Sequence, residues 1–296
     1  MPHLVLIGTL LVWSFSFLAA ARLRQDLGLT ESVAARFMPV LVGAGLLLLL
    51  RRPLKIPRPA WPRVVLMGLL SVPAYNLAFF HGLKTVPSGT AALIIALTPV
   101  FTAVLARLLL GEAFGPRKAL GLLVAMSGLF VVIRYGTDKA VDWPYLSSAL
   151  ILALAPLSWS LYTVIGRSLP EGSDAFDTTY ALLFAGSLPL LAFARVSTAA
   201  TLLARPWSLA SALYLAVGCT LVGYATFLWA LRRLPANETA AFIFLNPPLA
   251  NLWAFLIEGT PIRLPYVVGA LILLLGVALI VLPPFAVRRH AGRVKA

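Results

Sequence analysis

The sequence contains little that suits a water-facing surface. Charged residues make up only 11% of the 296 positions, whereas hydrophobic residues make up 60%, and the mean hydropathy is +0.94. Such a chain has too little polar surface to cover a soluble globule. Its apolar runs are long enough to cross a hydrocarbon core of about 30 Å as helices. We therefore expect an all-α integral membrane protein.

Cysteine and histidine are also scarce, and their scarcity excludes several kinds of chemistry. The one cysteine, Cys219, lies inside an apolar run, so neither a disulfide framework nor a thiol metal cluster is available. The three histidines, His3, His81 and His290, are far apart in the sequence. No HExxH, GxSxG or P-loop pattern occurs. We expect no enzymatic activity, no metal and no cofactor.

Ten apolar segments are present, and each predicts a transmembrane helix. The first resembles a signal peptide, but no Lys or Arg precedes it and a matching segment occurs later, so we expect a helix that stays in the membrane. The predicted spans are 4–21, 30–50, 64–84, 88–110, 118–134, 146–167, 177–195, 209–231, 237–257 and 264–284.

The net charge of +14 does not indicate a nucleic-acid partner, because the basic residues are scattered between the apolar segments. They instead predict topology. If the N-terminus is cytoplasmic, the inner loops contain more Lys and Arg than the outer loops, and the 51–63 loop makes most of the difference. The positive-inside rule then places both termini in the cytoplasm of a multi-pass cell-membrane protein.

The chain repeats itself. Pro235 and Pro247 lie 148 positions after Pro87 and Pro99, and Trp159-Ser160 lies 146 positions after Trp13-Ser14. A unit of about 147 residues with five spans enters the membrane from the opposite side in its second copy, because five is odd. We therefore expect two inverted five-helix repeats around a central cavity, as in many secondary transporters. The expected parts are repeat one at 1–134, a linker at 135–144, repeat two at 145–284 and a basic cytoplasmic tail at 285–296.

Four glycines follow the same offset. Gly121 and Gly128 match Gly269 and Gly276, 148 positions on. Small residues at such positions let helix backbones approach closely in lipid, so we expect close helix packing at these glycines.

Several motifs together resemble the EamA-type repeat of the drug/metabolite transporter superfamily. They are WSFSF at 13–17, ARF at 35–37, SGTAALI at 88–94, TPV at 98–100, the pair Gly111-Glu112, and the stretch from Gly121 to Gly128. The resemblance covers nearly the whole chain twice and implies a ten-helix exporter of small metabolites working by alternating access. Among such exporters, the aromatic-rich helices look similar to those of aromatic amino acid exporters. The second half departs from the pattern, with Glu258-Gly259 and Asn246-Pro247-Pro248 at the corresponding places.

Pro99 and Pro247 are candidate helix breaks. Each proline frees the carbonyl four residues earlier, and Thr98 and Asn246 stand beside them. Freed carbonyls and these side chains would suit the polar end of a substrate if the broken segments line a cavity. The alternative is a kink that only shapes helix packing.

Aromatic and polar side chains at helical spacing are candidates for the cavity wall, where a ring would stack and a polar head would form hydrogen bonds. The alternatives are a helix-packing face or an interfacial aromatic belt. The candidates are Trp13, Asn76, Phe79, Phe80, His81, Trp159, Tyr162, Tyr224 and Phe227.

Arg36 is a charge well inside a predicted span. A guanidinium at such depth costs roughly 2.5–3.5 kcal/mol on insertion scales, so it faces the protein interior or snorkels to the headgroups. In the interior it would attract a carboxylate.

The ten acidic residues all lie in predicted loops or near span ends. A proton-coupled transporter usually carries a carboxylate or histidine relay at membrane depth, so we expect facilitated diffusion or exchange. Neutral amino acids, aromatic ones above all, fit best as cargo. A nucleotide sugar, a cationic aromatic compound, or a channel-like or structural membrane protein are the alternatives. We expect a monomer whose partners are a small-molecule substrate and membrane lipid.

Overall fold

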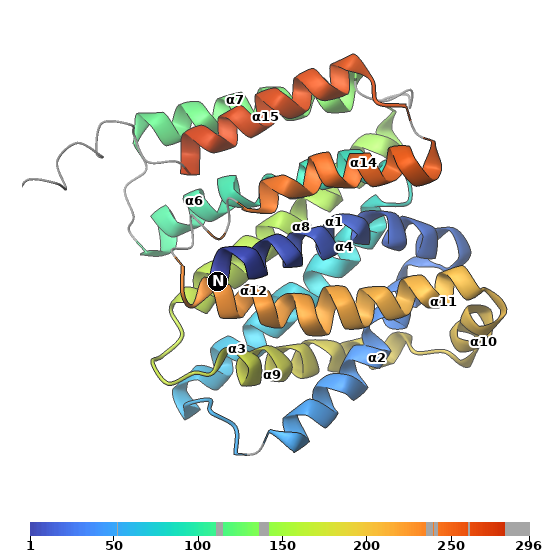
Figure 1. Ribbon diagram of the computed structural model, residues 1–296, viewed down its shortest axis with the longest axis vertical. Coiled ribbons are helices and arrows are strands. Elements are labelled where there is room, and N and C mark those ends of the chain that lie inside the picture. The colour runs from blue at the N-terminus through green and yellow to red at the C-terminus, as the bar shows by residue number, and fades with distance from the viewer. Residues whose placement is uncertain are drawn as a thin grey trace, which may run out of the picture.

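The computed structural model describes residues 1–51, 53–110, 115–135, 142–234, 239, 242–259 and 261–281, and every regular element in these ranges is helical (Figure 1). The sequence predictions for Gly111-Glu112, Pro235, most of the linker and the basic tail concern residues outside these ranges.

The described elements are α1 (Pro2–Asp26), α2 (Leu29–Leu50), η1 (Arg58–Ala60), α3 (Trp61–Leu69), η2 (Leu70–Ala74), α4 (Tyr75–Gly82), α5 (Ser88–Ile95), α6 (Thr98–Leu110), α7 (Pro116–Tyr135), α8 (Trp143–Arg167), α9 (Ala175–Ser187), η3 (Leu188–Phe193), α10 (Val196–Ala204), α11 (Pro206–Leu213), η4 (Tyr214–Val222), α12 (Gly223–Leu231), η5 (Phe242–Leu245), α14 (Asn246–Glu258) and α15 (Leu264–Val281).

Among the described residues, eight helical stretches are long and apolar enough to cross a membrane. They are Pro2–Asp26, Leu29–Leu50, Arg58–Gly82, Ser88–Leu109, Pro116–Tyr135, Trp143–Arg167, Ala175–Phe193 and Pro206–Leu231. The ninth and tenth predicted spans correspond to α14, which has 13 residues, and α15, which has 18. The chain is therefore a multi-pass membrane protein, as its composition indicates.

The helices lie roughly parallel to one another and form a stack in Figure 1, from α2 and α9 at one extreme to α7 and α15 at the other. Helices far apart in the sequence are neighbours. The first helix, α1, packs against α12 and α14, and α8 packs against α4 and α6. Two further contacts join α2 with α9 and α7 with α15. The middle of the stack therefore brings together α1, α4, α8, α12 and the short helices beside them.

Two of the membrane-crossing stretches contain a π-helical segment. In such a segment each backbone N–H bonds to the carbonyl five residues earlier, instead of four as in an α-helix. The first is η2, between α3 and α4, where Pro73 has no N–H to donate. The second is η4, between α11 and α12, where the Thr220 hydroxyl donates to the Leu215 carbonyl at 2.8 Å. Each segment leaves carbonyl groups that side chains reach, and Asn76 Nδ2 donates to Ser71 O and Val72 O at 3.0 and 2.9 Å.

Close helix packing at the repeated glycines is confirmed, and the structure shows that the two helices in contact there are α7 and α15. A Cβ added to Gly128 would lie 2.3 Å from the backbone nitrogen of Leu273, and one added to Gly276 would lie 2.2 Å from that of Ala125. Gly269 and Gly121 provide the facing carbonyls. The two backbones can touch only because these positions have no side chain, which is the packing that the repeated glycines predict.

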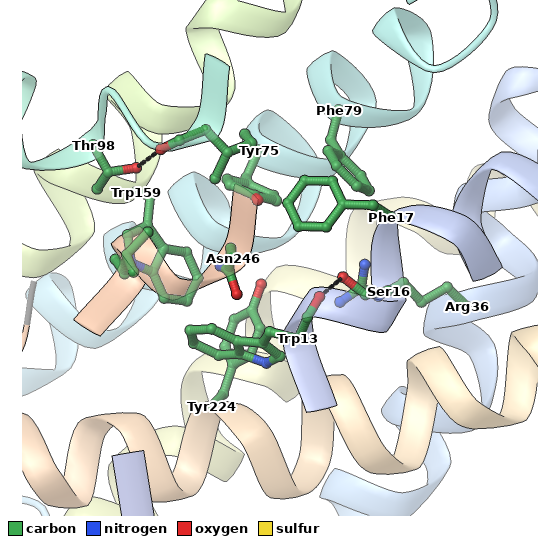
Figure 2. A pocket seen from close by; sticks show the side chains of 12 residues that line it. Trp13, Ser16, Phe17, Arg36, Tyr75, Phe79, Thr98, Trp159, Tyr224 and Asn246 are labelled. Carbon is green, nitrogen blue, oxygen red and sulfur yellow. Dashed lines mark hydrogen bonds between the residues drawn. The ribbon is translucent and has the colours of Figure 1, made fainter. Parts of the chain in front are cut away.

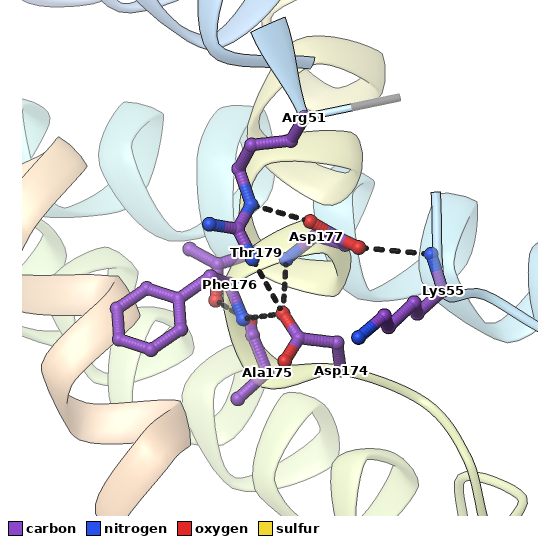
Figure 3. A network of polar contacts seen from close by, with 7 residues as sticks. All are labelled: Arg51, Lys55, Asp174, Ala175, Phe176, Asp177 and Thr179. Atoms are coloured by element: carbon purple, nitrogen blue, oxygen red, sulfur yellow. Dashed lines mark hydrogen bonds and ion pairs between the residues drawn. The ribbon is translucent and has the colours of Figure 1, made fainter. Parts of the chain in front are cut away.

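Polar contacts join neighbouring helices near their ends, on both of the faces where the chain passes from one helix to the next. At one end, the buried Asp177 carboxylate accepts hydrogen bonds from Arg51 Nε at 2.6 Å and from the backbone N–H of Lys55 at 2.8 Å (Figure 3). Asp174 accepts from Arg51 Nη2 at 3.2 Å and caps α9 through the N–H groups of Phe176 and Asp177. The hydrogen bond to Asp177 raises the pKa of Arg51 above its ordinary value. We call this the Asp177 end.

At the opposite end, Asp26 accepts hydrogen bonds from Arg205 Nη1, at 3.1 Å, and from the Ser208 hydroxyl. These contacts tie the end of α1 to the start of α11. We call this the Asp26 end. The ion pair between Glu31 and Arg195, at 4.0 Å, adds a weaker contact there.

Candidate functional site

A cavity lies in the middle of the stack, and its wall comes from both matched parts of the chain (Figure 2). About 50 Å³ of it admits the centre of a water molecule, which is below the roughly 300–1,000 Å³ of typical small-molecule sites, so the cavity is narrow in this structure. The lining residues are Trp13, Ser16, Phe17, Arg36, Tyr75, Phe79, Ile95, Thr98, Trp159, Tyr224, Ile243 and Asn246.

Aromatic rings form most of the wall and support one another edge to face. The Trp13 and Trp159 ring centroids are 5.4 Å apart at 90°, and those of Trp159 and Tyr224 are 5.0 Å apart at 90°. Tyr75 stacks on Phe79 at 5.8 Å. Such pairs each contribute roughly 0.5–1.5 kcal/mol beyond the burial of their area. The wall is therefore a fixed aromatic surface rather than a set of independent side chains.

The orientation of Trp13 depends on η4. Its indole Nε1 donates to the Cys219 carbonyl at 2.8 Å, one of the carbonyls of the π-helical segment. Gly223 makes this possible, because a Cβ there would lie 2.4 Å from Trp13 Nε1. The hydrogen bond and the missing side chain together hold the indole against the cavity.

Arg36 brings a positive charge to the cavity wall. The side chain is only 5% exposed, and its Nε and Nη2 donate to the Thr220 hydroxyl oxygen at 3.0 and 2.9 Å. It does not snorkel to a membrane surface, the alternative that the sequence left open. No carboxylate of the described residues lies within ion-pair distance of Arg36. Its contacts among the described residues include the Thr220 hydroxyl and the Phe37 ring, whose centroid is 5.2 Å from the guanidinium carbon, so no described carboxylate neutralises its charge.

Two helices begin at the cavity, at matched positions. The fourth predicted span is divided into α5 and α6, and α6 begins at Thr98, directly before Pro99. In the second half α14 begins at Asn246, directly before Pro247. The Thr98 hydroxyl donates to the Ile95 carbonyl at 2.6 Å, so the carbonyl freed by Pro99 already has one partner. Helix N-termini carry a partial positive charge, which favours an anionic group in the cavity.

Two buried polar atoms of the wall have no hydrogen-bond partner, Trp159 Nε1 and Asn246 Oδ1. Buried polar groups in proteins are normally paired, so an unpaired donor and acceptor in one cavity are groups that a ligand can satisfy. Together with Arg36, they offer a solute one charged donor, one neutral donor and one acceptor.

Seven of the predicted site residues line this cavity: Trp13, Arg36, Phe79, Thr98, Trp159, Tyr224 and Asn246. Two others, Tyr162 and Phe227, are buried behind it with ring centroids 4.8 and 5.4 Å from that of Trp159. Phe80 is buried against Phe79. Asn76 turns back to the carbonyls of η2, and His81, Pro99 and Pro247 are not part of the wall.

Five residues of the cavity wall were not predicted from the sequence: Ser16, Phe17, Tyr75, Ile95 and Ile243. Helical spacing and the repeat offset could have indicated four of them. Phe17 follows Trp13 by one helical turn, and Tyr75 precedes Phe79 by one turn. Ile95 and Ile243 are themselves a matched pair, 148 positions apart.

The fold and the cavity define a class of protein. An aromatic cavity with a few polar groups, in the middle of a multi-pass helical membrane protein, is typical of the binding site of a transporter.

Comparison with known proteins gives the family. The model of the EamA-like transporter family matches residues 1–134 and again 146–282, so the chain belongs to this family of the drug/metabolite transporter superfamily. It is 29% identical to the Uncharacterized transporter YyaM of Bacillus subtilis, over 72% of this chain and 70% of that protein. It is 31% identical to a Probable terminal-alkyne amino-acid exporter of Streptantibioticus cattleyicolor, over 74% of each.

The fold also has a match among solved structures. A crystal structure described only as "Crystal structure of protein" superposes with a TM-score of 0.64 at 18% sequence identity, covering 94% of this chain and 95% of that one.

Proposed function

We propose that this transporter carries small zwitterionic metabolites, aromatic or other neutral amino acids above all, with the carboxylate held by Arg36. The observation that carries the proposal is the buried Arg36 guanidinium at the wall of an aromatic cavity, with a neutral threonine as its described partner. Exposing a cation to a closed apolar space is costly unless a counter-charge is bound. The N-termini of α6 and α14 favour the same negative group.

The rest of the cavity suits the other parts of such a solute. The faces of Trp13, Trp159 and Tyr224 provide a surface for an aromatic or apolar side group. The unpaired Asn246 Oδ1 is an acceptor for an ammonium group. A nucleotide sugar would require several cations at its phosphates, and Arg36 is the single Lys or Arg in the described wall. The narrow free space also favours a small solute.

Alternating access between two inverted five-helix repeats is the mechanism that we propose for its movement. The contacts support this, because exchanging the matched segments reproduces them: α1 meets α12 and α14 as α8 meets α4 and α6. The two π-helical segments also occupy matched stretches. The excess of Lys and Arg in the loops favours a cytoplasmic Asp177 end and cytoplasmic termini. No carboxylate or histidine lines the described cavity, which favours facilitated diffusion or exchange.

Counterflow in proteoliposomes tests the proposal. We expect L-phenylalanine to exchange, and Arg36→Gln to weaken its apparent affinity roughly 30-fold or more, since truncating one partner of a buried charge pair costs about 2–5 kcal/mol. Phenethylamine lacks the carboxylate, so any transport of it should be unchanged in the variant. The matched control is Arg22→Gln, which removes an exposed arginine bonded only to Gln25.

Two results would contradict the proposal. If Arg36→Gln exchanges L-phenylalanine as well as the unchanged protein does, the carboxylate is not bound at Arg36. If exchange stops when the pH gradient across the liposome membrane is collapsed, transport is not uncoupled.

A further inference from the structure

A second cavity opens at the Asp26 end and shares no lining residue with the central one. It lies between the end of α1, the segment from Leu83 to Thr90, and the helices α14 and α15. About 500 Å³ of it admits the centre of a water molecule, against about 50 Å³ in the central cavity. A small solute therefore fits in the open part of this cavity.

The start of α5 faces this cavity without a cap. Ser88, Gly89 and Thr90 line the cavity, and the residue before them is Pro87, whose side chain has no group that could cap the helix. Ala91 N–H bonds to the Pro87 carbonyl, so the N–H groups of the first three helical residues are the ones that need partners. Tyr266 fixes this turn by donating its hydroxyl to the Gly89 carbonyl at 3.1 Å.

An independent feature of the same turn points to a ligand. The Thr90 side chain is 1% exposed, lines the cavity, and has a hydroxyl with no hydrogen-bond partner. A helical threonine usually donates to the carbonyl of the preceding turn. Leaving a buried hydroxyl unpaired costs roughly 1–3 kcal/mol. The Thr90 hydroxyl is therefore available to a ligand as a hydrogen-bond donor and acceptor.

Charges of both signs line the same cavity. Lys84 and Glu258 line the cavity, and neither has an ion-pair partner among the described residues. Arg24 also lines it, with Nε and Nη1 bonded to the carbonyls of Phe80 and Leu27, so its charge is not neutralised by a carboxylate. The cavity therefore offers an ammonium and a guanidinium near a helix N-terminus, and one carboxylate on α14.

We infer that this cavity is a second binding site for the zwitterionic head of an amino acid, which occupies it between the aqueous phase and the central cavity. The Thr90 hydroxyl and the uncapped N-terminus of α5 hold the carboxylate with Lys84, and Glu258 holds the ammonium group. The inference rests on the proposed function, because it assigns to the same amino acid a second binding site between the aqueous phase at the Asp26 end and the central cavity.

Protection of a thiol tests the inference. Gln25 is exposed and lines the cavity, so Gln25→Cys in a Cys219→Ser background places a single reactive thiol there. We expect L-phenylalanine to slow alkylation of this thiol in proteoliposomes. Phenethylamine and 3-phenylpropionate, each with half of the zwitterionic head, should protect at least tenfold less well. Arg232→Cys, an exposed position beside Asp174 at the Asp177 end, is the matched control, where no protection is expected.

Variants separate this site from the central one. Thr90→Val keeps the shape of the side chain and should raise the half-protecting concentration roughly tenfold, the value of a hydrogen bond to a charged group. Glu258→Gln should act in the same direction. Arg36→Gln removes the central contact and should leave protection at Gln25→Cys intact.

The outcomes distinguish the two ideas. If L-phenylalanine undergoes counterflow but does not protect the thiol, or if protection is lost in Arg36→Gln and kept in Thr90→Val, the second site is refuted and the proposed function stands. If L-phenylalanine neither exchanges nor protects, both are refuted.

Discussion

The contact between Asp177 and Arg51 makes a quantitative prediction about stability. Asp177→Ala removes two hydrogen bonds to a buried carboxylate, one from Arg51 Nε at 2.6 Å and one from Lys55 N at 2.8 Å. Hydrogen bonds to charged groups contribute roughly 1.5–3 kcal/mol each. Because the Arg51 side chain is 41% exposed, water replaces part of its bond, and we take the lower limit for both. The expected loss is about 3 kcal/mol.

The assay is thermal unfolding of the detergent-solubilised protein, followed by tryptophan fluorescence. At about 2–4 °C per kcal/mol, the loss corresponds to a fall in Tm of roughly 6–12 °C. Asp142→Ala is the matched control, since Asp142 caps α8 through one bond to Tyr145 N at 2.9 Å. A lost N-cap costs about 1 kcal/mol, or roughly 2–4 °C.

A double-mutant cycle identifies the partner. In an Arg51→Met background, Asp177→Ala should cost about half as much, because only the bond to Lys55 N–H remains to be lost. The reasoning is refuted if Asp177→Ala lowers the Tm no more than Asp142→Ala, or if its cost is the same with and without Arg51.

Two further predictions concern packing and pH. Gly276→Ala should destabilise the protein by roughly 1–3 kcal/mol in the same assay, because its Cβ would lie 2.2 Å from Ala125 N. Gly8→Ala is the control and should not destabilise, since a Cβ there would have nothing within 4 Å. Equal effects of the two substitutions would contradict close packing at Gly276. Asp177 raises the pKa of Arg51, so this contribution to stability is present below the ordinary arginine pKa and is lost only as pH rises beyond it. By the same reasoning, Arg51→Lys should begin to lose Tm only as pH rises beyond the ordinary lysine pKa of about 10.4, where the unchanged protein shows no such extra loss.

Much of the helical layout could be predicted from sequence, because membrane length and hydropathy constrain it strongly. The first eight spans needed only the apolar runs, and the repeated glycines predicted close helix packing, although the structure was needed to show that α7 packs on α15. The contact between Arg51 and Asp177 could not be predicted in the same way. Its partners are 126 residues apart, and no local pattern connects them.

The cavity was partly predictable for a related reason. Arg36 and the residues beside Pro99 and Pro247 are conspicuous in apolar runs, so their chemistry alone marks them. The face of the third span was harder, because helical spacing places both Tyr75 and Asn76 on the same side of α4 as Phe79. Spacing alone does not show that Tyr75 lines the cavity with Phe79, while Asn76 bonds the carbonyls of η2.

The glycine contact between α7 and α15 has a consequence for how this architecture diversifies. One helix comes from each matched part of the chain, and neither contributes a residue to the central cavity. This contact between the two parts is thus separate from the proposed cargo site, unlike the contacts of α1 with α12 and of α4 with α8, whose helices line the cavity. Cavity residues can therefore change for new cargo while the contact between α7 and α15 is kept.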